Sequence, residues 1–194
     1  MRAYATRPAS WCVLRMAQCC SLDAEGSIIS ADAPGAPTAA FMVRHPAHLI
    51  ALGAGAGLVP GAPGTAGTLL AFPLYWVLAS YCTALTLLGL IALGFALGVW
   101  ACARTGRALG VSDHGAIVWD EIVAFMLVLF FTPAGLLWQA FAFLLFRLFD
   151  ILKPPPIRYY DRTLKSGFGV MFDDLLAAAY TVLMLAVARM LIGG

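Results

Sequence analysis

The sequence predicts an all-α integral membrane protein, folded as a compact bundle of about five transmembrane helices with glycine-rich cytoplasmic loops. Of its 194 residues, 62% are hydrophobic and only 11% are charged, whereas a soluble domain carries roughly 25% charged residues. Long runs after Arg44 contain no Asp, Glu, Lys or Arg. The chain has 12 Lys and Arg residues and 10 Asp and Glu residues, and so it lacks the stripe of basic residues that binds the phosphate backbone of a nucleic acid. These observations exclude a soluble enzyme, a disordered chain and a nucleic-acid binder.

Residues 68–103 predict the first pair of membrane helices. This block carries no charge, and it is too long for one span of about 20 residues and slightly short for two separate spans. We therefore expect a tight helical hairpin that turns near residues 80–83. Residues 116–152 form a second, largely apolar block with Pro133 near its middle. Because proline ends or kinks a helix, this block predicts a second hairpin.

Residues 175–192 predict a fifth span, and the charges indicate which ends of the helices share a membrane face. The two hairpin turns carry no charge, whereas cations cluster in residues 104–116 and 153–174. Cytoplasmic loops carry an excess of Lys and Arg, so these two segments are expected in the cytoplasm. The acidic residues beyond residue 45 lie in or near the same segments. We therefore expect the chemistry of the protein at its cytoplasmic face.

The first 41 residues differ from the rest of the chain. They contain Cys12, Cys19 and Cys20 and three arginines before any acid, and they lack an apolar stretch of signal-peptide length. Their bias resembles that of a transit peptide only weakly. We interpret residues 1–41 as a leader, either disordered or arising from a wrongly assigned start, with the working chain beginning at Met42. Residues 42–194 then form a single membrane domain.

A glycine-rich segment, Gly53–Gly67, precedes the first hairpin. Its glycines and prolines disfavour a continuous helix. One interpretation is a loop whose N–H groups contact a phosphate, assisted by the N-terminus of the following helix. The other is that small residues allow close helix packing in lipid. Taken alone, the segment favours the packing interpretation, because glycine-rich stretches are common in membrane proteins.

Two acidic pairs stand at the predicted starts of the third and fifth helices. Asp120 and Glu121 directly precede a long uncharged run, and Asp173 and Asp174 directly precede the last span. Helix N-termini favour acidic side chains, which explains one acid on a surface but poorly explains two beside a bilayer core. Carboxylates at such a boundary are candidates for function by default.

Arg147, Asp150 and Lys153 recur every three residues and therefore share one helix face. They form either a ladder of ion pairs that reaches to the interface, or a site in which Asp150 faces a metal and the cations face phosphate oxygens. Together with the acidic pairs, Asp150 completes a set of carboxylates that repel one another unless a cation or protons compensate them. Hard oxygen ligands suit Mg2+ bridged to phosphate. These features indicate a phosphorylated lipid as the substrate.

Residues 42 to about 192 resemble the phosphatidylglycerophosphatase A family of integral membrane lipid phosphatases. Four separate stretches carry the resemblance in the family's order: Pro63–Thr68, Asp113–Glu121, Phe146–Asp150 with Lys153-Pro154 and Pro156-Ile157, and Gly167–Asp174. Thr68 stands where the family often has serine, and Ser166 stands where a glycine usually opens the last stretch. The first 41 residues match nothing in the family pattern.

The resemblance implies a Mg2+-dependent enzyme that removes the terminal phosphate of phosphatidylglycerophosphate and yields phosphatidylglycerol at the cytoplasmic face of the bacterial inner membrane. It makes five carboxylates the leading metal-binding or catalytic residues: Asp120, Glu121, Asp150, Asp173 and Asp174. Asp113 and His114 are further catalytic candidates, although a lone interfacial histidine is more often structural. The candidates for binding the substrate phosphate are Arg147, Lys153, Arg158, Gly64, Thr65 and Gly67.

Two other classes of function are alternatives. A small membrane transporter would use the same carboxylates as an ion or proton path, and it predicts acids spread through the depth of the bundle. The acids here gather on one predicted face, which favours the enzyme. A structural membrane subunit without chemistry leaves the paired acids unexplained.

Overall fold

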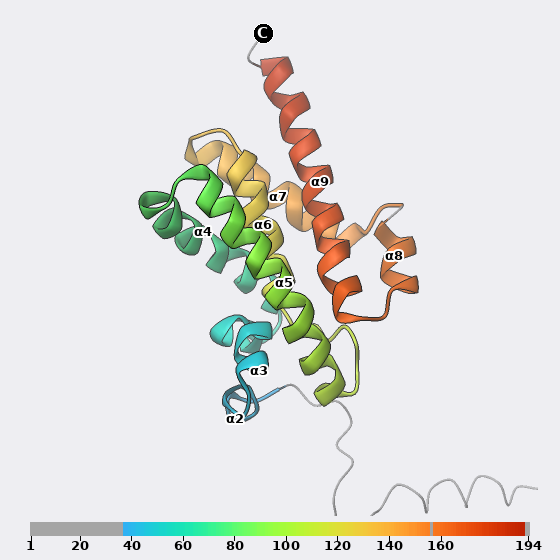
Figure 1. Ribbon diagram of the computed structural model, residues 1–194. Helices are drawn as coiled ribbons and strands as arrows, with labels where there is room; N and C mark the ends of the chain where they lie inside the picture. Colours follow the sequence, from blue (N-terminus) through green and yellow to red (C-terminus); the bar gives the residue numbers. More distant parts are fainter. Residues whose placement is uncertain (1–36, 156, 193–194) are drawn as a thin grey trace, which may run out of the picture. The chain divides into compact units, whose positions relative to one another are not determined.

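The computed structural model describes residues 37–155 and 157–192, and these residues form helices joined by turns and loops, with no strand among them. The predicted all-helical class is therefore confirmed. In chain order (Figure 1) the elements are α2 (Ala39–Val43), α3 (Pro46–Ala51), the 3-10 helix η1 (Gly53–Leu58), α4 (Pro63–Tyr81), α5 (Ala84–Leu109), α6 (Trp119–Phe131), α7 (Leu136–Leu152), α8 (Ile157–Thr163) and α9 (Gly167–Ile192).

Helices α4 and α5 lie on either side of the first predicted turn, but they pack mainly against other helices rather than against each other as a tight hairpin. Helix α4 ends at Tyr81, and α5 begins after Thr83, which acts as its N-cap. The Oγ1 atom of Thr83 accepts a hydrogen bond from the N–H group of Thr86 at 3.3 Å, and such a cap satisfies a donor that the first helical turn leaves unpaired. The turn therefore lies within the predicted residues 80–83.

The second predicted hairpin is formed by α6 and α7. Helix α6 ends at Phe131 and α7 begins at Leu136, so Pro133 lies in the connection. Helix α7 ends at Leu152 because Lys153 adopts a left-handed conformation with φ of 42° and the next residue is a proline, which cannot continue the helix. The hairpin brings the end of α7 back toward the start of α6.

The glycine-rich segment before the first hairpin is only partly a loop. Helix η1 contains Ala54 at φ 52° and Gly55 at φ 112°, so no continuous helix crosses the segment, as expected. Its second half differs from the expectation, because Gly64–Gly67 form the first turn of α4. Pro63 stands at the first helical position, where the missing N–H group costs nothing and the fixed φ favours the helix.

Helix α9 begins at Gly167, about two turns before the expected residue 175. A β-carbon on Gly167 would lie 2.6 Å from the β-carbon of Ala103 in α5, and one on Gly169 would overlap the carbonyl oxygen of Leu164. These glycines therefore permit close packing of a helix rather than forming a loop. As a result, Asp173 and its neighbour Asp174 lie inside α9, and the expectation that they start the helix is wrong.

Helix α6 is the central helix of the described residues. It packs against α4, α5, α7 and α9, and most of its side chains between Ile122 and Leu129 are buried. The surrounding helices expose large apolar side chains, including Leu85, Leu144 and Leu183. An apolar exterior around an apolar interior is typical of a protein in contact with lipid.

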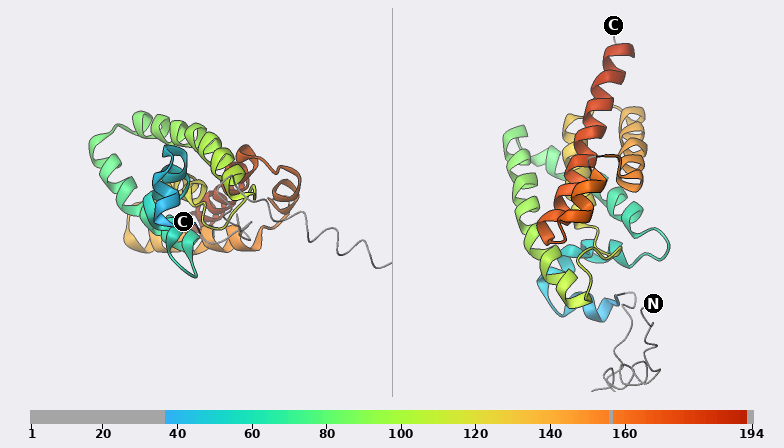
Figure 2. Two further views of the ribbon diagram at one scale, coloured as in Figure 1. Left: turned by 90° about the horizontal axis from the view of Figure 1, so that it is seen from below. Right: turned by 90° about the vertical axis from the view of Figure 1, so that its right-hand side faces the viewer.

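Helices α5 and α9 are each long and apolar enough to cross a membrane by their length and composition. The C-terminal turns of α9 extend past the other helices (Figure 2), where Met190 is 79% exposed. Exposed apolar turns of this kind are consistent with a membrane-associated protein.

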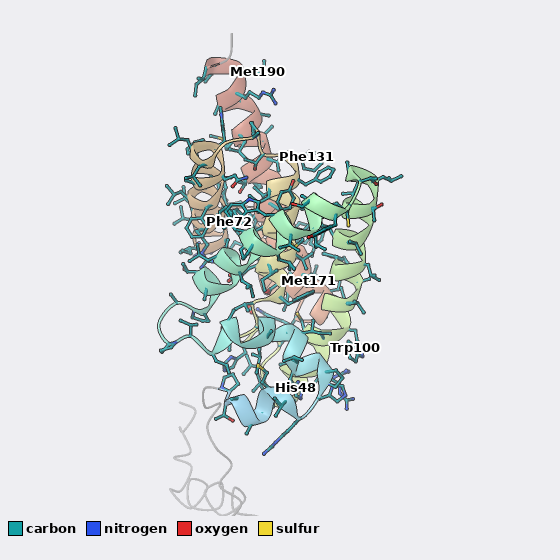
Figure 3. All side chains as sticks on the ribbon, turned by 90° about the vertical axis from the view of Figure 1, so that its left-hand side faces the viewer. His48, Phe72, Trp100, Phe131, Met171 and Met190 are labelled. Carbon is teal, nitrogen blue, oxygen red and sulfur yellow. The ribbon has the colours of Figure 1, made fainter. Side chains whose placement is uncertain are left out.

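Helix α3 packs against α5. This contact lies at the end of the helical bundle opposite the turn of α9 that carries Met190 (Figure 3). The ring of Phe41 stacks on that of His48 with 4.3 Å between the centroids, and the Nδ1 atom of His48 lies 2.9 Å from the Oγ1 atom of Thr105 in α5. Burial, followed by the charges of His45 and Arg104, lowers the pKa of His48. A neutral, buried histidine therefore joins α3 to α5.

The predicted leader lies mostly outside the described residues, because the description begins at residue 37. Its boundary at residue 41 falls within α2, which runs from Ala39 to Val43. The Oγ1 atom of Thr38 accepts a hydrogen bond from the N–H group of Phe41 and caps this helix. The residues just before Met42 therefore belong to the same folded unit as α3.

Candidate active site

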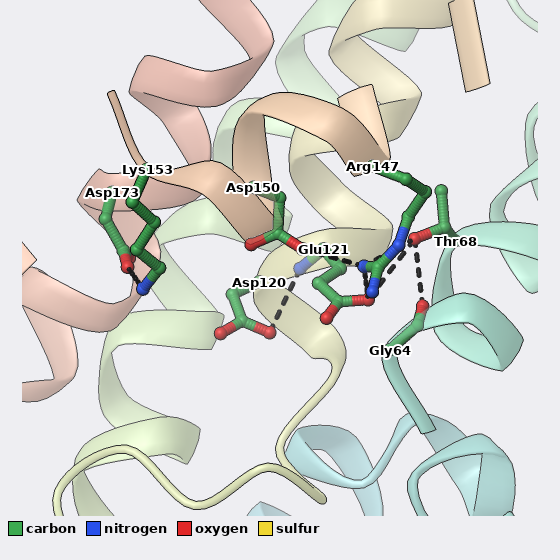
Figure 4. Close-up of polar contacts among 8 residues, drawn as sticks. All are labelled: Gly64, Thr68, Asp120, Glu121, Arg147, Asp150, Lys153 and Asp173. Atoms are coloured by element: carbon green, nitrogen blue, oxygen red, sulfur yellow. Dashed lines mark hydrogen bonds and ion pairs between the residues drawn. The ribbon is translucent and has the colours of Figure 1, made fainter. Parts of the chain in front are cut away.

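A cluster of charged side chains lies where the start of α4, the start of α6, the end of α7 and the first turns of α9 meet (Figure 4). The structure brings into this cluster all five carboxylates predicted from the sequence, together with two of the predicted cations and one threonine: Asp120, Glu121, Asp150, Asp173, Asp174, Arg147, Lys153 and Thr68. We refer to these residues as the polar cluster.

Arg147 joins α7 to α6. Its Nη1 atom lies 2.9 Å from the Oε2 atom of Glu121 and 2.8 Å from the Oδ2 atom of Asp150. All three side chains are at most 16% exposed, so the ion pairs are shielded from solvent and stronger than surface pairs. The Nε atom of Arg147 is buried and has no hydrogen-bond partner among the described residues. The i,i+3 pair that the sequence predicts is therefore present, and Arg147 keeps a free donor.

Thr68 is the residue of the cluster that was absent from the predicted site residues. It is fully buried, and its Oγ1 atom lies 2.9 Å from the carbonyl oxygen of Gly64 and 3.2 Å from the Oε2 atom of Glu121. The Nη1 atom of Arg147 lies 3.5 Å from the same hydroxyl. The sequence feature that could have indicated Thr68 as a site residue is its position at the end of the Pro63–Thr68 stretch, one helical turn after Gly64.

The glycines of α4 bring this helix against the start of α6. A β-carbon on Gly64 would lie 2.6 Å from the Oε2 atom of Glu121, and one on Gly67 would lie 2.8 Å from the β-carbon of Val118. Thr65, between them, is partly exposed. The geometry therefore favours the interpretation in which Gly64 and Gly67 allow close helix packing over the one in which they bind phosphate.

Lys153 joins the end of α7 to α9. Its Nζ atom lies 2.5 Å from the Oδ2 atom of Asp173, whose side chain is 6% exposed. Lys153 therefore does not continue the ladder on its own helix face, because the left-handed backbone at this residue directs the chain away from α7. The pair instead holds the first turns of α9 beside the second hairpin.

Asp120 and Asp174 are deeply buried carboxylates of the polar cluster, and neither forms an ion pair with Lys or Arg among the described residues. They are 6% and 4% exposed. The Oδ1 atom of Asp120 accepts a hydrogen bond from the N–H group of Glu121 at 3.0 Å, whereas the buried Oδ2 atom of Asp174 has no hydrogen-bond partner in the described part of the chain. Burying an uncompensated carboxylate is costly, so a cation or a proton is needed at this point.

The donor set fits a hard divalent cation. Mg2+ keeps several waters and binds through one or two carboxylates together with substrate phosphate oxygens. The orphan oxygen of Asp174, in electrostatic range of Asp120 and Asp150, has the chemistry of such a ligand. Among the described residues, no group of three or more His, Cys, Asp or Glu side chains is arranged to hold a metal ion by itself.

Three other predicted residues lie outside the polar cluster. Asp113 is exposed and shares the lining of a small hollow with Asp173. The Nδ1 atom of His114 accepts a hydrogen bond from the N–H group of Ala116 at 3.2 Å, so this histidine stabilises its own loop. Arg158 is exposed on α8, and no contact with the cluster is present in the described part of the chain.

The fold and the cluster define a helical, membrane-associated protein with carboxylates and cations gathered at one end of its helices. A family model described as Phosphatidylglycerophosphatase A matches residues 49–189, and the chain belongs to this family. The match covers every residue of the polar cluster.

Curated relatives carry the same description. The chain is 48% identical to Phosphatidylglycerophosphatase A of Haemophilus influenzae over 149 residues, which is 76% of this chain and 91% of the relative. It is 40% identical to Phosphatidylglycerophosphatase A of Escherichia coli over 136 residues, or 70% of this chain and 78% of the relative. A Bacteroides thetaiotaomicron relative, 40% identical over 75% of this chain and 94% of its own length, is named provisionally as a phosphatidylinositol-3-phosphatase. No solved structure matches the chain significantly.

Proposed function

We propose that the chain hydrolyses the terminal phosphate monoester of phosphatidylglycerophosphate and releases phosphatidylglycerol and inorganic phosphate. The family and the two relatives that carry its description support this activity. The observation that carries it in the structure is the polar cluster itself, in which buried carboxylates alternate with Arg147 and Lys153 beside apolar helices. Such a site combines recognition of a phosphate with contact to the lipid that bears it.

The proposal includes the membrane arrangement. Helices α4, α5, α6, α7 and α9 correspond in sequence to the five predicted spans, and in this proposal they cross the membrane with the polar cluster at one of its faces. The excess of Lys and Arg in residues 104–116 and 153–174 supports a cytoplasmic orientation of that face. The protein is then a multi-pass protein of the bacterial inner membrane.

We also propose that the site uses Mg2+, held chiefly by Asp120 and Asp174, with Glu121, Asp150 and Asp173 beside them. The support is the burial of the first two carboxylates without a cationic partner among the described residues. When bound, Mg2+ supplies positive charge that neutralises phosphate oxygens and activates water. Glu121, Asp150 and Asp173 keep their ion pairs to Arg147 and Lys153 and orient those cations.

Arg147 and Lys153 have a separate role, which is to bind the phosphoryl oxygens. The guanidinium group of Arg147 has further N–H donors beyond the Nη1 atom that binds Glu121 and Asp150, and its buried Nε atom has no hydrogen-bond partner within residues 37–155 and 157–192. Charge-assisted hydrogen bonds from these donors stabilise the negative charge that develops on the phosphoryl oxygens. In the reaction, a water oxygen bonds to phosphorus and the water gives up a proton, the bond from phosphorus to the glycerol oxygen breaks, and the glycerol oxygen takes up a proton, so that one water is divided between inorganic phosphate and phosphatidylglycerol.

The apolar surroundings of the cluster disfavour the transporter alternative. An ion path requires polar groups through the depth of the bundle. After Glu121, the remaining residues of α6 through Phe131 are all apolar, and most are buried against the other helices. The acidic groups of the described residues therefore stop at one end of the central helix.

Release of inorganic phosphate from phosphatidylglycerophosphate by the purified protein in detergent tests the proposal. We expect release with Mg2+ and loss of release with a chelator, with restoration when Mg2+ is added back. Absence of release from this lipid contradicts the substrate, and release that ignores the chelator contradicts the metal. Phosphatidylinositol-3-phosphate serves as the competing substrate, because one relative carries that description.

A further inference from the structure

Two apolar hollows follow one side of α9. The first, of about 290 Å3, lies between α5, α6 and α9 and is lined by residues that include Phe95 and Met171. The second, of about 460 Å3, continues between α6 and α9 and includes Val182 in its lining. Leu127 and Leu175 line both. The two hollows are therefore adjacent, and we refer to them together as the α9 groove.

The α9 groove begins beside the polar cluster. Leu175 directly follows Asp174 in α9, and the residues that line the groove continue along α9 from Met171 to Ala186. At about 1.5 Å per residue, this stretch covers roughly 22 Å along the helix. One leaflet of a bilayer has a hydrocarbon depth of roughly 15 Å. The groove is therefore long enough to hold an extended lipid tail whose head group lies at the cluster.

Several residues that line the groove have small side chains. Ala92 of α5 lines the first hollow, and Ala178, Ala179 and Ala186 of α9 line the second. Among the residues that the structure describes, those lining the groove include no charged side chain, which excludes a second phosphate group as the occupant. The groove thus matches an aliphatic chain in length and polarity.

We propose that the α9 groove holds one acyl chain of the lipid whose terminal phosphate is hydrolysed at the polar cluster. The inference rests on the proposed function and names the part of the substrate that α5, α6 and α9 recognise. Because bilayer tails are as apolar as the groove, moving a tail into it gives little hydrophobic free energy. Its effect is to fix the depth and direction of the head group relative to Arg147 and Asp174, and such positioning accelerates a reaction.

A photoreactive lipid tests the occupant directly. The probe is phosphatidylglycerophosphate with a diazirine near the end of one acyl chain, incorporated into detergent micelles with the full chain. We expect the label on residues 175–186, and we expect Ala179→Phe, which fills the second hollow, to reduce it at least about fivefold. Ala79→Phe is the matched control, because Ala79 is exposed on α4 and lies outside the lining. Label spread evenly over the lipid-facing helices, or unchanged by Ala179→Phe, overturns the inference.

Kinetics separate the groove from the reaction itself. For Ala92→Phe and Ala179→Phe we expect kcat/KM for the diacyl substrate to fall roughly tenfold, while hydrolysis of the deacylated head group stays within about twofold of wild type. Ala79→Phe leaves both unchanged. If wild type hydrolyses neither substrate, the proposed function fails. If wild type hydrolyses both and the groove variants match it, the groove inference alone fails. A change of oligomeric state at unchanged kcat/KM would instead make the groove an interface between copies and also overturns the inference.

Discussion

The carboxylate of Glu121 occupies the space that a side chain at position 64 would need. A β-carbon on Gly64 would lie 2.6 Å from the Oε2 atom of Glu121, and the same oxygen lies 2.9 Å from the Nη1 atom of Arg147. The contact thus couples the first turn of α4 to the ion pairs of α6 and α7. Position 64 is therefore tied to the geometry of the site although glycine carries no functional group.

Gly64→Ala tests this coupling. The added methyl group displaces Glu121, so we expect a loss of about 1–3 kcal/mol in the free energy of unfolding and a fall in phosphate release. Gly89→Ala is the control, because a β-carbon there meets no atom within 4 Å and alanine raises helix propensity by up to about 1 kcal/mol. Thermal unfolding in detergent and phosphate release measure both variants. Equal stability of the two would mean that Glu121 is not held against α4.

Arg147→Lys tests the bridging role of the guanidinium group. Lysine keeps the charge but lacks the planar set of donors that contacts Glu121, Asp150 and a phosphate together. We expect kcat to fall roughly 100-fold or more. Arg189→Lys, on the exposed last turns of α9, is the control and leaves kcat unchanged. Retention of most activity by Arg147→Lys would show that a point charge is sufficient at this position.

Asp174→Asn separates stability from catalysis. The substitution removes a buried charge whose Oδ2 atom has no partner among the described residues, so in the presence of a chelator we expect the variant to be at least as stable as wild type. We expect kcat to fall by roughly 1,000-fold. Mg2+ should raise the Tm of wild type but not that of the variant, because only a ligand that binds the folded state stabilises it. A variant with near-normal turnover removes Asp174 from the site.

His48 gives the protein a specific pH dependence of stability. Burial lowers the pKa of His48 in the folded state below the unfolded value of about 6.5, so the unfolded chain takes up a proton first as the pH falls. The stabilisation is fully present above about pH 7 and is lost as the pH falls through the unfolded and then the folded pKa. We expect Tm to fall between pH 7.5 and 5.5 through this residue. His48→Gln should show a flatter profile, and an unchanged slope would assign the effect to other groups.

The positions of the hairpins were predictable from the sequence because they depend on composition and local breaks. The absence of charge over residues 68–103 and the proline at position 133 predict two turns between helices, and in the structure helices end and begin at both places. Likewise, spacing of three residues placed Arg147 beside Asp150. These features follow from helix geometry alone, and no tertiary information is needed to find them.

The roles of the glycines and of Thr68 were not predictable in the same way. A glycine that breaks a helix and one that admits a neighbouring helix look alike in a single sequence, and only the contact of Gly169 with Leu164 or of Gly64 with Glu121 decides between them. Thr68 acts through partners on α6 and α7, which are 53 and 79 residues away in the chain. The partner of Lys153 was missed for the same reason, since Asp173 lies on another helix.

Because α6 is enclosed by other helices, the parts of the chain differ in which substitutions they can accept during evolution. A helix buried on all sides tolerates only replacements of nearly equal volume, such as leucine for methionine, so Phe125 and Leu129 sit under a strict size limit. Exposed positions such as Leu85 and Val77 face no such limit and require only apolar character. Substitutions should therefore accumulate in an outer layer of the protein, while its centre keeps both the shape and the orientation of the acidic pair at the start of α6.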